Sequence, residues 1–210
     1  FNFTHSARHF VTDSSAAATA LATGYLTLNG AVGVTVDGTR LKTSLEYAED
    51  EGKWTGLVVT CRVTHATPAS MVSHVKSRAS EEEIAPQIAS SGVEVILGGG
   101  WDMFLPKREL KIGAPPALGD GMLISAGRAS LPAAGEPRAA LRETLAAAAA
   151  EKLLIGPDGK PYGIRKDGKD LIAEMTKAGY RSIRTPAELA MVNVGPPTKV
   201  LGLFHSGPLP

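Results

Sequence analysis

The chain has 210 residues, of which 43% are hydrophobic and 20% are charged, and its formal net charge at pH 7 is +1. This composition is typical of a globular protein with one sizeable core. The small net charge gives no reason to expect nucleic acid or an anionic membrane surface as a partner. No apolar run approaches the roughly 20 residues that a membrane-spanning helix needs. Because Cys61 is the only cysteine, the chain has no internal disulfide.

Both ends of the sequence have the features of a cut chain. Phe1 is not an initiator methionine, and the charged-then-apolar order of a signal peptide does not follow it. At the other end, the apolar run Lys199–Phe204 is followed by one loop, and the sequence stops. We therefore expect a fragment, or a chain sequenced only in part, that is incomplete at both ends.

The first predicted element is a helix in the stretch VTDSSAAATALATG, Val11–Gly24, where Asp13, Ser14 and Ser15 precede small residues. An aspartate or serine side chain can cap a helix by accepting from its free N–H groups. The same N–H groups and the helix dipole favour an anion, so a hydroxyl placed among them could attack a bound phosphate. The stretch alone leaves both interpretations open.

Helical and strand patterns alternate along the rest of the chain. Helices are predicted at Thr43–Gly52, at a segment that Ser80 caps and Pro86 interrupts, and at Asp167–Tyr180. Continuous apolar runs predict three buried strands: Trp54–Thr60, Val93–Gly100 and Lys199–Phe204. This alternation predicts an α/β fold with a mostly parallel central sheet and helices on both of its faces.

The composition changes between about residues 107 and 162. Proline and glycine become frequent there, and no strand pattern is present. One alanine-rich helix is predicted inside this stretch, from Arg138 to about Lys152. We interpret residues 107–162 as an insertion in a single α/β domain that spans residues 1–210.

The segment CRVTHATPASMVSHVKSR, Cys61–Arg78, follows the first predicted strand. His65 and Thr67 come just after the carboxyl end of that strand, where open α/β sheets bind their ligands. Pro68 suits a first helical position, which makes Thr67 a candidate cap.

The helix expected after Pro68 would carry His74 and Arg78 on one side, four residues apart. His74 is interpreted as structural, and Arg78 alone could be a solvated helix end. Together with Asp13 and Ser14, the segment indicates a hydroxyl nucleophile, an oxygen-rich metal corner and a guanidinium that clamps phosphate oxygens in pairs.

The segments VTDSSAAATALATG…NGAVGV and THATPASMVSHVKSR resemble the nucleophile segment and the second active-site segment of the alkaline phosphatases. VILGGG, YGIRKDGKDLIAEMTKAGY and LGLF occur in the same order in that family. The resemblance covers nearly the whole chain except the stretch 107–162. It implies metal-dependent hydrolysis of phosphate monoesters through a phosphoserine intermediate, with release of inorganic phosphate. An inactive fragment, or a phosphate-binding module without the zinc ligands, is the alternative.

The resemblance implies a role for five residues. Ser14 would be the phosphorylated nucleophile and would face zinc, and Asp13 would hold the arginine. Arg78 would bind two non-bridging phosphate oxygens. Thr67 would be an oxygen ligand of magnesium, and His65 would act near that ion through water. The family uses one magnesium ion and two zinc ions, and the zinc ions clamp the attacking and leaving oxygens.

The zinc ligands of that family are aspartates and histidines that lie upstream of the nucleophile and downstream of LGLF, and those segments are missing from this sequence. His5 and His9 could share a helix face, but no helical pattern supports such a metal site. We therefore expect the 210-residue chain alone to hold no zinc pair and to be inactive. The resemblance also implies a homodimer and a periplasmic or secreted location.

Other enzyme classes fit the sequence less well. Members of the wider phosphatase–sulfatase superfamily would often use threonine or a modified cysteine as nucleophile, whereas this chain has Asp13 and Ser14 together with Arg78. The Gly-x-Ser-x-Gly elbow of esterases does not occur. GGGWD is not a phosphate-binding loop, because no Gly-Lys-Ser/Thr follows it.

Overall fold

The computed structural model describes residues 3–107, 163–192 and 198–206. The insertion predicted at about 107–162, with its helix from Arg138 to about Lys152, lies outside the described residues apart from Lys107. Both predictions therefore stay predictions.

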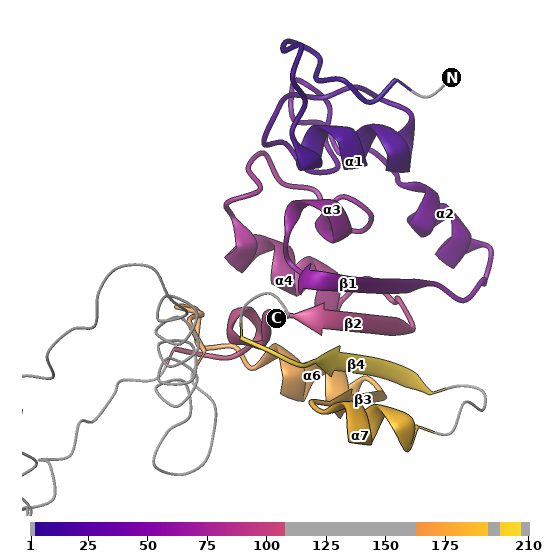
Figure 1. Ribbon diagram of the computed structural model, residues 1–210, viewed down its shortest axis with the longest axis vertical. Helices are drawn as coiled ribbons and strands as arrows, with labels where there is room; N and C mark the ends of the chain where they lie inside the picture. The colour runs from indigo at the N-terminus through magenta and orange to yellow at the C-terminus, as the bar shows by residue number, and fades with distance from the viewer. Residues whose placement is uncertain (1–2, 108–162, 193–197, 207–210) are drawn as a thin grey trace, which may run out of the picture. The chain divides into compact units, whose positions relative to one another are not determined.

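The described part of the chain is built on a four-stranded parallel sheet in the order β1-β2-β4-β3 (Figure 1). Its strands are β1 (Gly56–Arg62), β2 (Val95–Gly99), β3 (Tyr180–Ile183) and β4 (Lys199–Leu203). The three predicted strands are present, with ends that differ by at most two residues. The sequence analysis missed β3, whose two middle residues are exposed and interrupt the apolar pattern. The predicted parallel α/β fold is confirmed.

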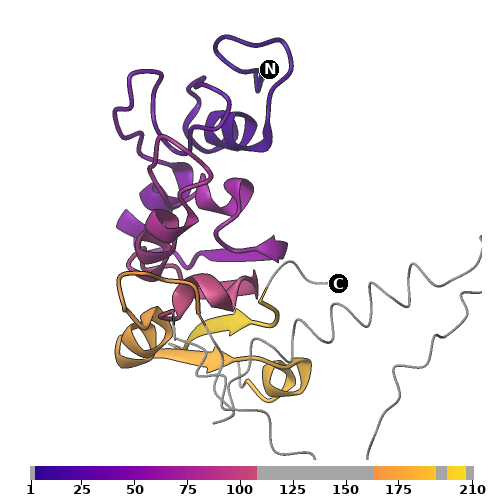
Figure 2. The ribbon, with the colours of Figure 1, turned by 90° about the vertical axis from the view of Figure 1, so that its left-hand side faces the viewer.

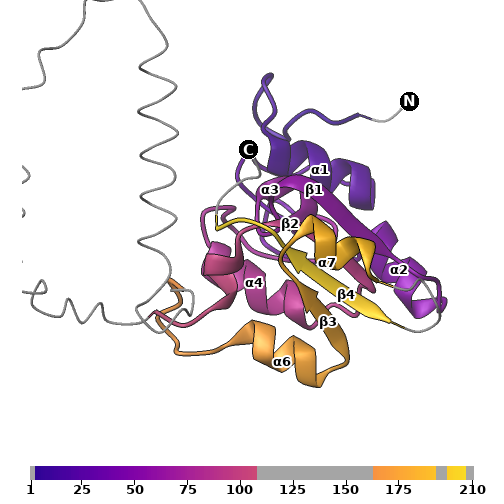
Figure 3. The same ribbon diagram turned by 60° about the horizontal axis from the view of Figure 1, so that its bottom comes forward.

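Helices lie on both faces of this sheet, as predicted. Helices α4 (Glu81–Ala89) and α6 (Leu171–Lys177) lie on one face, and α7 (Pro186–Ala190) lies on the other (Figures 2 and 3). The core on the α4 and α6 side consists of aliphatic side chains that are at most 1% exposed, among them Ile84, Ile88, Ile96, Leu171 and Leu201. Helix α2 (Ser44–Asp50) precedes β1, and the short 3-10 helix η1 (Trp101–Phe104) follows β2.

Helix α4 continues through Pro86, which the sequence analysis counted against a straight helix. A proline has no N–H to donate to the carbonyl four residues earlier, here that of Glu82. The guanidinium of Arg165 donates to this carbonyl instead, at 3.2 Å, and also to the Met103 carbonyl at 3.2 Å. Arg165 is only 3% exposed. A buried side chain thus replaces the hydrogen bond that the proline removes.

The chain also pairs across the gap in the described residues. The Lys107 N–H donates to the Arg165 carbonyl at 2.7 Å, and the Gly163 N–H donates to the Pro106 carbonyl at 3.2 Å. The described residues on either side of 108–162 are therefore hydrogen-bonded neighbours.

Helix α1 (Ser14–Thr23) begins directly after Asp13 and ends at Gly24, whose φ of 78° is left-handed. Its buried residues are all small, so its backbone can approach a neighbouring element closely. That neighbour is the short helix α3 (Ala66–Ala69). The small side chains of α1 therefore allow α1 and α3 to pack closely together.

The prediction that Thr67 caps a helix is wrong. The residue before α3 is His65, and its side chain makes no cap hydrogen bond. Thr67 and Pro68 are the second and third residues of α3. Proline is tolerated there because the first N–H groups of a helix have no partner within the helix. Ser80 does precede α4 as predicted, but without a side-chain cap bond.

The prediction that His74 and Arg78 share one side of a helix is also wrong, because α3 ends at Ala69. The chain turns instead, and Val75 forms an antiparallel bridge with Val32. Two backbone hydrogen bonds of 3.0 and 2.9 Å join these valines. Pairing with a distant segment, rather than helix periodicity, therefore places Arg78.

A substitution at Gly33 tests how closely these paired segments pack. Gly33 has a φ of 59°, and a Cβ there would lie 2.2 Å from the Ser73 carbonyl oxygen and 2.8 Å from His74 Nδ1. Gly24 is the matched control, because its φ is 78° but no atom lies within 4 Å of the added Cβ. We expect both alanine variants to lose about 1–2 kcal/mol of unfolding free energy to backbone strain, and Gly33→Ala to lose about 1–3 kcal/mol more. Equal losses in urea unfolding would contradict the close approach.

Candidate active site

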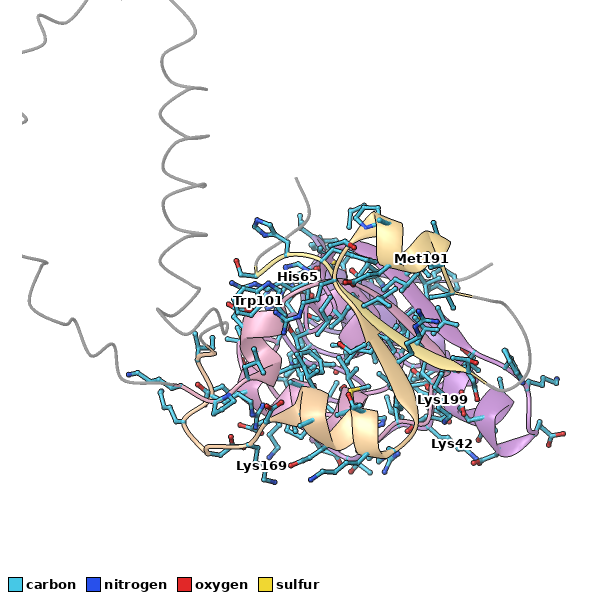
Figure 4. The ribbon with its side chains drawn as sticks, turned by 90° about the horizontal axis from the view of Figure 1, so that it is seen from below. Lys42, His65, Trp101, Lys169, Met191 and Lys199 are labelled. Carbon is cyan, nitrogen blue, oxygen red and sulfur yellow. The ribbon has the colours of Figure 1, made fainter. Side chains whose placement is uncertain are left out.

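The candidate site lies at the N-terminal end of α1, where the segments Asp13–Ser15, Asn29–Gly30 and His65–Arg78 meet. His65 comes shortly after the carboxyl end of β1. In Figure 4, His65 and Trp101 lie toward the end of the sheet at which the strands finish, and Lys42 and Lys199 lie toward the opposite end. Open α/β sheets bind their ligands at the former end.

The Asp13 carboxylate is the centre of a hydrogen-bonded group. It accepts from the Ala16 N–H at 2.9 Å, from the Gly30 N–H at 3.0 Å and from the Ser15 hydroxyl at 2.8 and 2.7 Å. It also pairs with Nη1 of Arg78 at 3.2 Å. Burial alone would raise the pKa of Asp13, but the hydrogen bonds together lower it below the ordinary value of 3.8. The carboxylate therefore stays ionised and is a weak base.

The two serines at the start of α1 have different surroundings. Ser15 is fully buried, and its hydroxyl donates to Asp13 while accepting from the Gly30 N–H at 3.0 Å. Ser14 is partly exposed, and its hydroxyl oxygen accepts from Nη1 of Arg78 at 2.7 Å. Of the two, only Ser14 offers an oxygen that an incoming ligand can reach.

Arg78 connects this group to His65. Its Nη2 contacts Nε2 of His65 at 3.0 Å. Because a guanidinium can only donate, this His65 nitrogen accepts and the ring of a neutral His65 carries its proton on Nδ1. The Arg78 side chain is 29% exposed. Its planar fork of donors therefore faces both Ser14 and solvent, an arrangement suited to an anion with paired oxygens.

Thr67 is not part of this hydrogen-bonded group. It lies in α3 with an exposed side chain and lines a hollow over β1 and β2 together with Thr60 and Cys61. Within the described ranges, no group of three or more His, Cys, Asp or Glu side chains could hold a metal ion. His5 and His9 are both exposed. The metal-facing roles of Thr67, His65 and Ser14 therefore stay predictions.

The sequence analysis quoted Asn29 and Gly30 only within the segment NGAVGV and gave them no role in supporting the site. The Asn29 side chain accepts from the Asp13 N–H at 3.1 Å and donates to the Val11 carbonyl at 3.0 Å. Asn29 and Gly30 form an Asn-Gly pair, a turn signal that could have drawn attention to this support. The contact between His65 and Arg78 had no comparable signal, because no single helix or strand joins the two residues.

Comparison with known proteins decides the family of the chain. The family model described as alkaline phosphatase matches residues 2–121, which is more than half of the 210 residues. The chain belongs to the alkaline phosphatase family.

Two curated alkaline phosphatases illustrate the extent of the similarity. Alkaline phosphatase 3 of Bacillus subtilis (strain 168) is 47% identical over 100 residues, which are 45% of this chain and 22% of that protein. Alkaline phosphatase H of Pseudomonas aeruginosa (strain UCBPP-PA14) is 30% identical over 204 residues, which are 96% of this chain and 35% of that protein. The chain thus spans between about a fifth and a third of the length of these relatives.

Solved structures of the alkaline phosphatase family share the fold. The enzyme from Thermus thermophilus has a TM-score of 0.66 at 34% identity, covering 99% of this chain and 31% of that chain. The enzyme from the Antarctic bacterium TAB5 has a TM-score of 0.65 at 26% identity, covering 99% of this chain and 44% of that chain. A variant of the TAB5 enzyme is described with Mg bound in its M3 site.

An Asp13→Asn variant tests the ionised carboxylate at the centre of the group. Because the folded-state pKa of Asp13 lies below 3.8, the ionised form stabilises the fold above pH 3.8. That stabilisation is lost as the pH falls through the folded-state pKa. We expect the variant to lose about 1–2 kcal/mol of unfolding free energy near pH 7, and the difference from the natural chain to shrink at about pH 3. Urea unfolding of both proteins at both pH values measures this difference in unfolding free energy. A difference that does not change with pH would contradict the lowered pKa.

Proposed function

We propose that the protein hydrolyses phosphate monoesters through a phosphoserine intermediate on Ser14 and releases inorganic phosphate. The contact of 2.7 Å between the Ser14 hydroxyl oxygen and Nη1 of Arg78 carries this proposal. A nucleophile and a guanidinium that binds phosphate oxygens in pairs are thereby one hydrogen bond apart. Membership of the alkaline phosphatase family supports this chemistry.

In the proposed reaction, Nη1 and Nη2 of Arg78 hold two non-bridging oxygens of the phosphate. The Ser14 oxygen attacks the phosphorus, the bond from phosphorus to the ester oxygen breaks, and the alcohol leaves with the proton that the hydroxyl loses. A water molecule then attacks the phosphoserine, and the bond between phosphorus and Ser14 breaks. Inorganic phosphate and the Ser14 hydroxyl are the products.

Asp13 acts in this proposal by orientation. Its carboxylate pairs with Arg78 and fixes the first turn of α1, while its lowered pKa makes it a poor acceptor for the Ser14 proton. His65 is also a poor base for Ser14, because its Nε2 already accepts from Arg78. A serine hydroxyl needs activation before it attacks, and neither side chain is assigned that task.

Two zinc ions and one magnesium ion belong to the proposal through the family resemblance. Thr67 would face magnesium, His65 would approach it through water, and Ser14 would face zinc. The alternative is a phosphate-binding module without zinc, and elemental analysis with a phosphomonoester assay on the natural protein separates the two. Turnover with two bound zinc ions would favour the enzyme.

A homodimer and a periplasmic or secreted location are likewise proposals that rest on the family resemblance. Of the helices that the structure describes, none is both long and apolar enough to cross a membrane.

Replacement of each serine tests the identity of the nucleophile. We expect Ser14→Ala in the natural protein to abolish the phosphoenzyme and turnover, because it removes the only accessible hydroxyl at the start of α1. Ser15→Ala serves as the control and should keep most turnover, since the buried Ser15 hydroxyl faces Asp13 and Gly30. Mapping the phosphopeptide after an acid quench provides the measurement. Label on Ser15 would contradict the assignment.

Replacement of Arg78 tests the phosphate clamp. Arg78→Ala removes two charge-assisted hydrogen bonds, each worth about 1.5–3 kcal/mol, so inhibition by inorganic phosphate should weaken at least about tenfold. Arg181→Ala is the matched control, because Arg181 is exposed on β3. Thermal unfolding shows whether the variants stay folded. Unchanged phosphate inhibition in Arg78→Ala would show that Arg78 does not bind the phosphate.

A further inference from the structure

His74 lies at a junction of three segments outside the hydrogen-bonded group around Ser14. Its side chain is 8% exposed. Its Nδ1 is 2.7 Å from the Gly33 carbonyl oxygen, and its Nε2 is 3.0 Å from Oε1 of Glu46 in α2. The His74 N–H donates to the side-chain oxygen of Gln87 in α4 at 2.8 Å. One histidine therefore connects α2, α4 and the loop after α1.

Both ring nitrogens of His74 face acceptors. The Gly33 carbonyl can only accept, so Nδ1 carries a proton. Burial raises the pKa of Glu46, but hydrogen bonds from the Thr43 N–H, His74 and Arg40 lower it overall. Glu46 is therefore a carboxylate, which also only accepts, so each ring nitrogen of His74 lies within hydrogen-bond distance of an acceptor.

The two segments that His74 bridges form a short antiparallel ladder. The Val32 N–H donates to the Val75 carbonyl at 3.0 Å, and the Val75 N–H donates to the Val32 carbonyl at 2.9 Å. Farther along, the Arg78 N–H donates to the Gly30 carbonyl at 2.7 Å. The ladder therefore has two ends. Arg78 pairs with Gly30 at one end, and His74 contacts Gly33 at the other.

The same ladder is bound to the helix that carries Ser14. The Gly33 N–H donates to the hydroxyl of the fully buried Thr19 in α1 at 3.0 Å. The Gly30 N–H donates to the Asp13 carboxylate at 3.0 Å. A shift of the ladder would therefore change the separation between the hydroxyl of Ser14 and the guanidinium of Arg78.

Several charged side chains lie near the ring of His74. Arg40 pairs with the same Glu46 carboxylate, and Lys42 pairs with Asp50. The hollow that His74 lines also has five charged side chains: Arg40, Lys42, Glu46, Glu49 and Asp50. From α4 the contact is the neutral Gln87. The acidic groups facing the ring thus come from α2.

We propose that His74 is a positioning residue, whose ring ties the Gly33 carbonyl to Glu46 and thereby holds Arg78 beside Ser14. This inference rests on the proposed function of Ser14 and Arg78. Without the imidazole ring the ladder loses its link to α2, so Arg78 is held less firmly. Phosphate then binds more weakly, and KM rises more than kcat falls.

A double-mutant cycle in the natural protein tests the connection to Arg78, with inorganic phosphate as the competitive inhibitor. His74→Phe should raise the inhibition constant about fivefold to thirtyfold when Arg78 is present, and less than about twofold in the Arg78→Ala background. His9→Phe, at an exposed histidine, is the matched control and should change nothing. An equal rise in both backgrounds would reveal a general structural role and overturn the proposal.

A second variant covers the case in which His74→Phe does not fold. Glu46→Gln removes the carboxylate that faces Nε2 of His74, so phosphate inhibition should weaken in the same direction. Unchanged phosphate inhibition in Glu46→Gln would overturn the proposal.

Failure of the proposed function can be told apart from failure of this inference. If Ser14 is not phosphorylated and phosphate does not bind, the proposed function fails. The placement of Arg78 is then read from the NMR signals of its guanidinium, which His74→Phe should shift or broaden. The signals of Arg165, held by Asp167 at 3.0 Å, should stay in place. Unchanged Arg78 signals would overturn the role of His74, whatever the function of the protein.

Discussion

The Asp13 carboxylate has donors from three parts of the chain, and the geometry of the site depends on this convergence. It caps α1 through the Ala16 N–H, holds the following loop through the Gly30 N–H, and pairs with Arg78. A carboxylate has about four lone-pair sites, and these donors together with Ser15 use them. The helix-capping and functional interpretations of the segment after Val11 are therefore not alternatives, because one side chain both starts the helix and orients the guanidinium beside Ser14.

The sequence predicts a helix or strand when its pattern of apolar residues is complete within a short segment of the chain. Strands β1, β2 and β4 were predicted because their continuous apolar runs are visible within a few residues. β3 has only Tyr180 and Ile183 as buried residues, so its pattern is too short to detect. Helix α7 was missed although Thr185 and Glu188 form a capping box, which is a local signal that the analysis could have used.

The residues of the candidate site were predicted more completely than the route that brings them together. The structure places Asp13, Ser14, Arg78 and His65 in one hydrogen-bonded group, while their catalytic roles remain proposals. The helix expected after Pro68 was wrong because Val75 pairs with Val32 instead. No helix or strand period within a single segment encodes pairing between segments that lie far apart in the chain. For the same reason, the link from His74 to Gly33 became visible only in three dimensions.

The pairing of Lys107 with Arg165 and of Gly163 with Pro106 has a consequence for how the chain tolerates change in length. The described residues that flank the stretch 108–162 are held together by backbone hydrogen bonds. The entropic cost of closing a loop grows only slowly with its length. We therefore expect a change in the length of this stretch to leave in place the hydrogen bond from Arg165 to the Glu82 carbonyl of α4 and the register of the sheet.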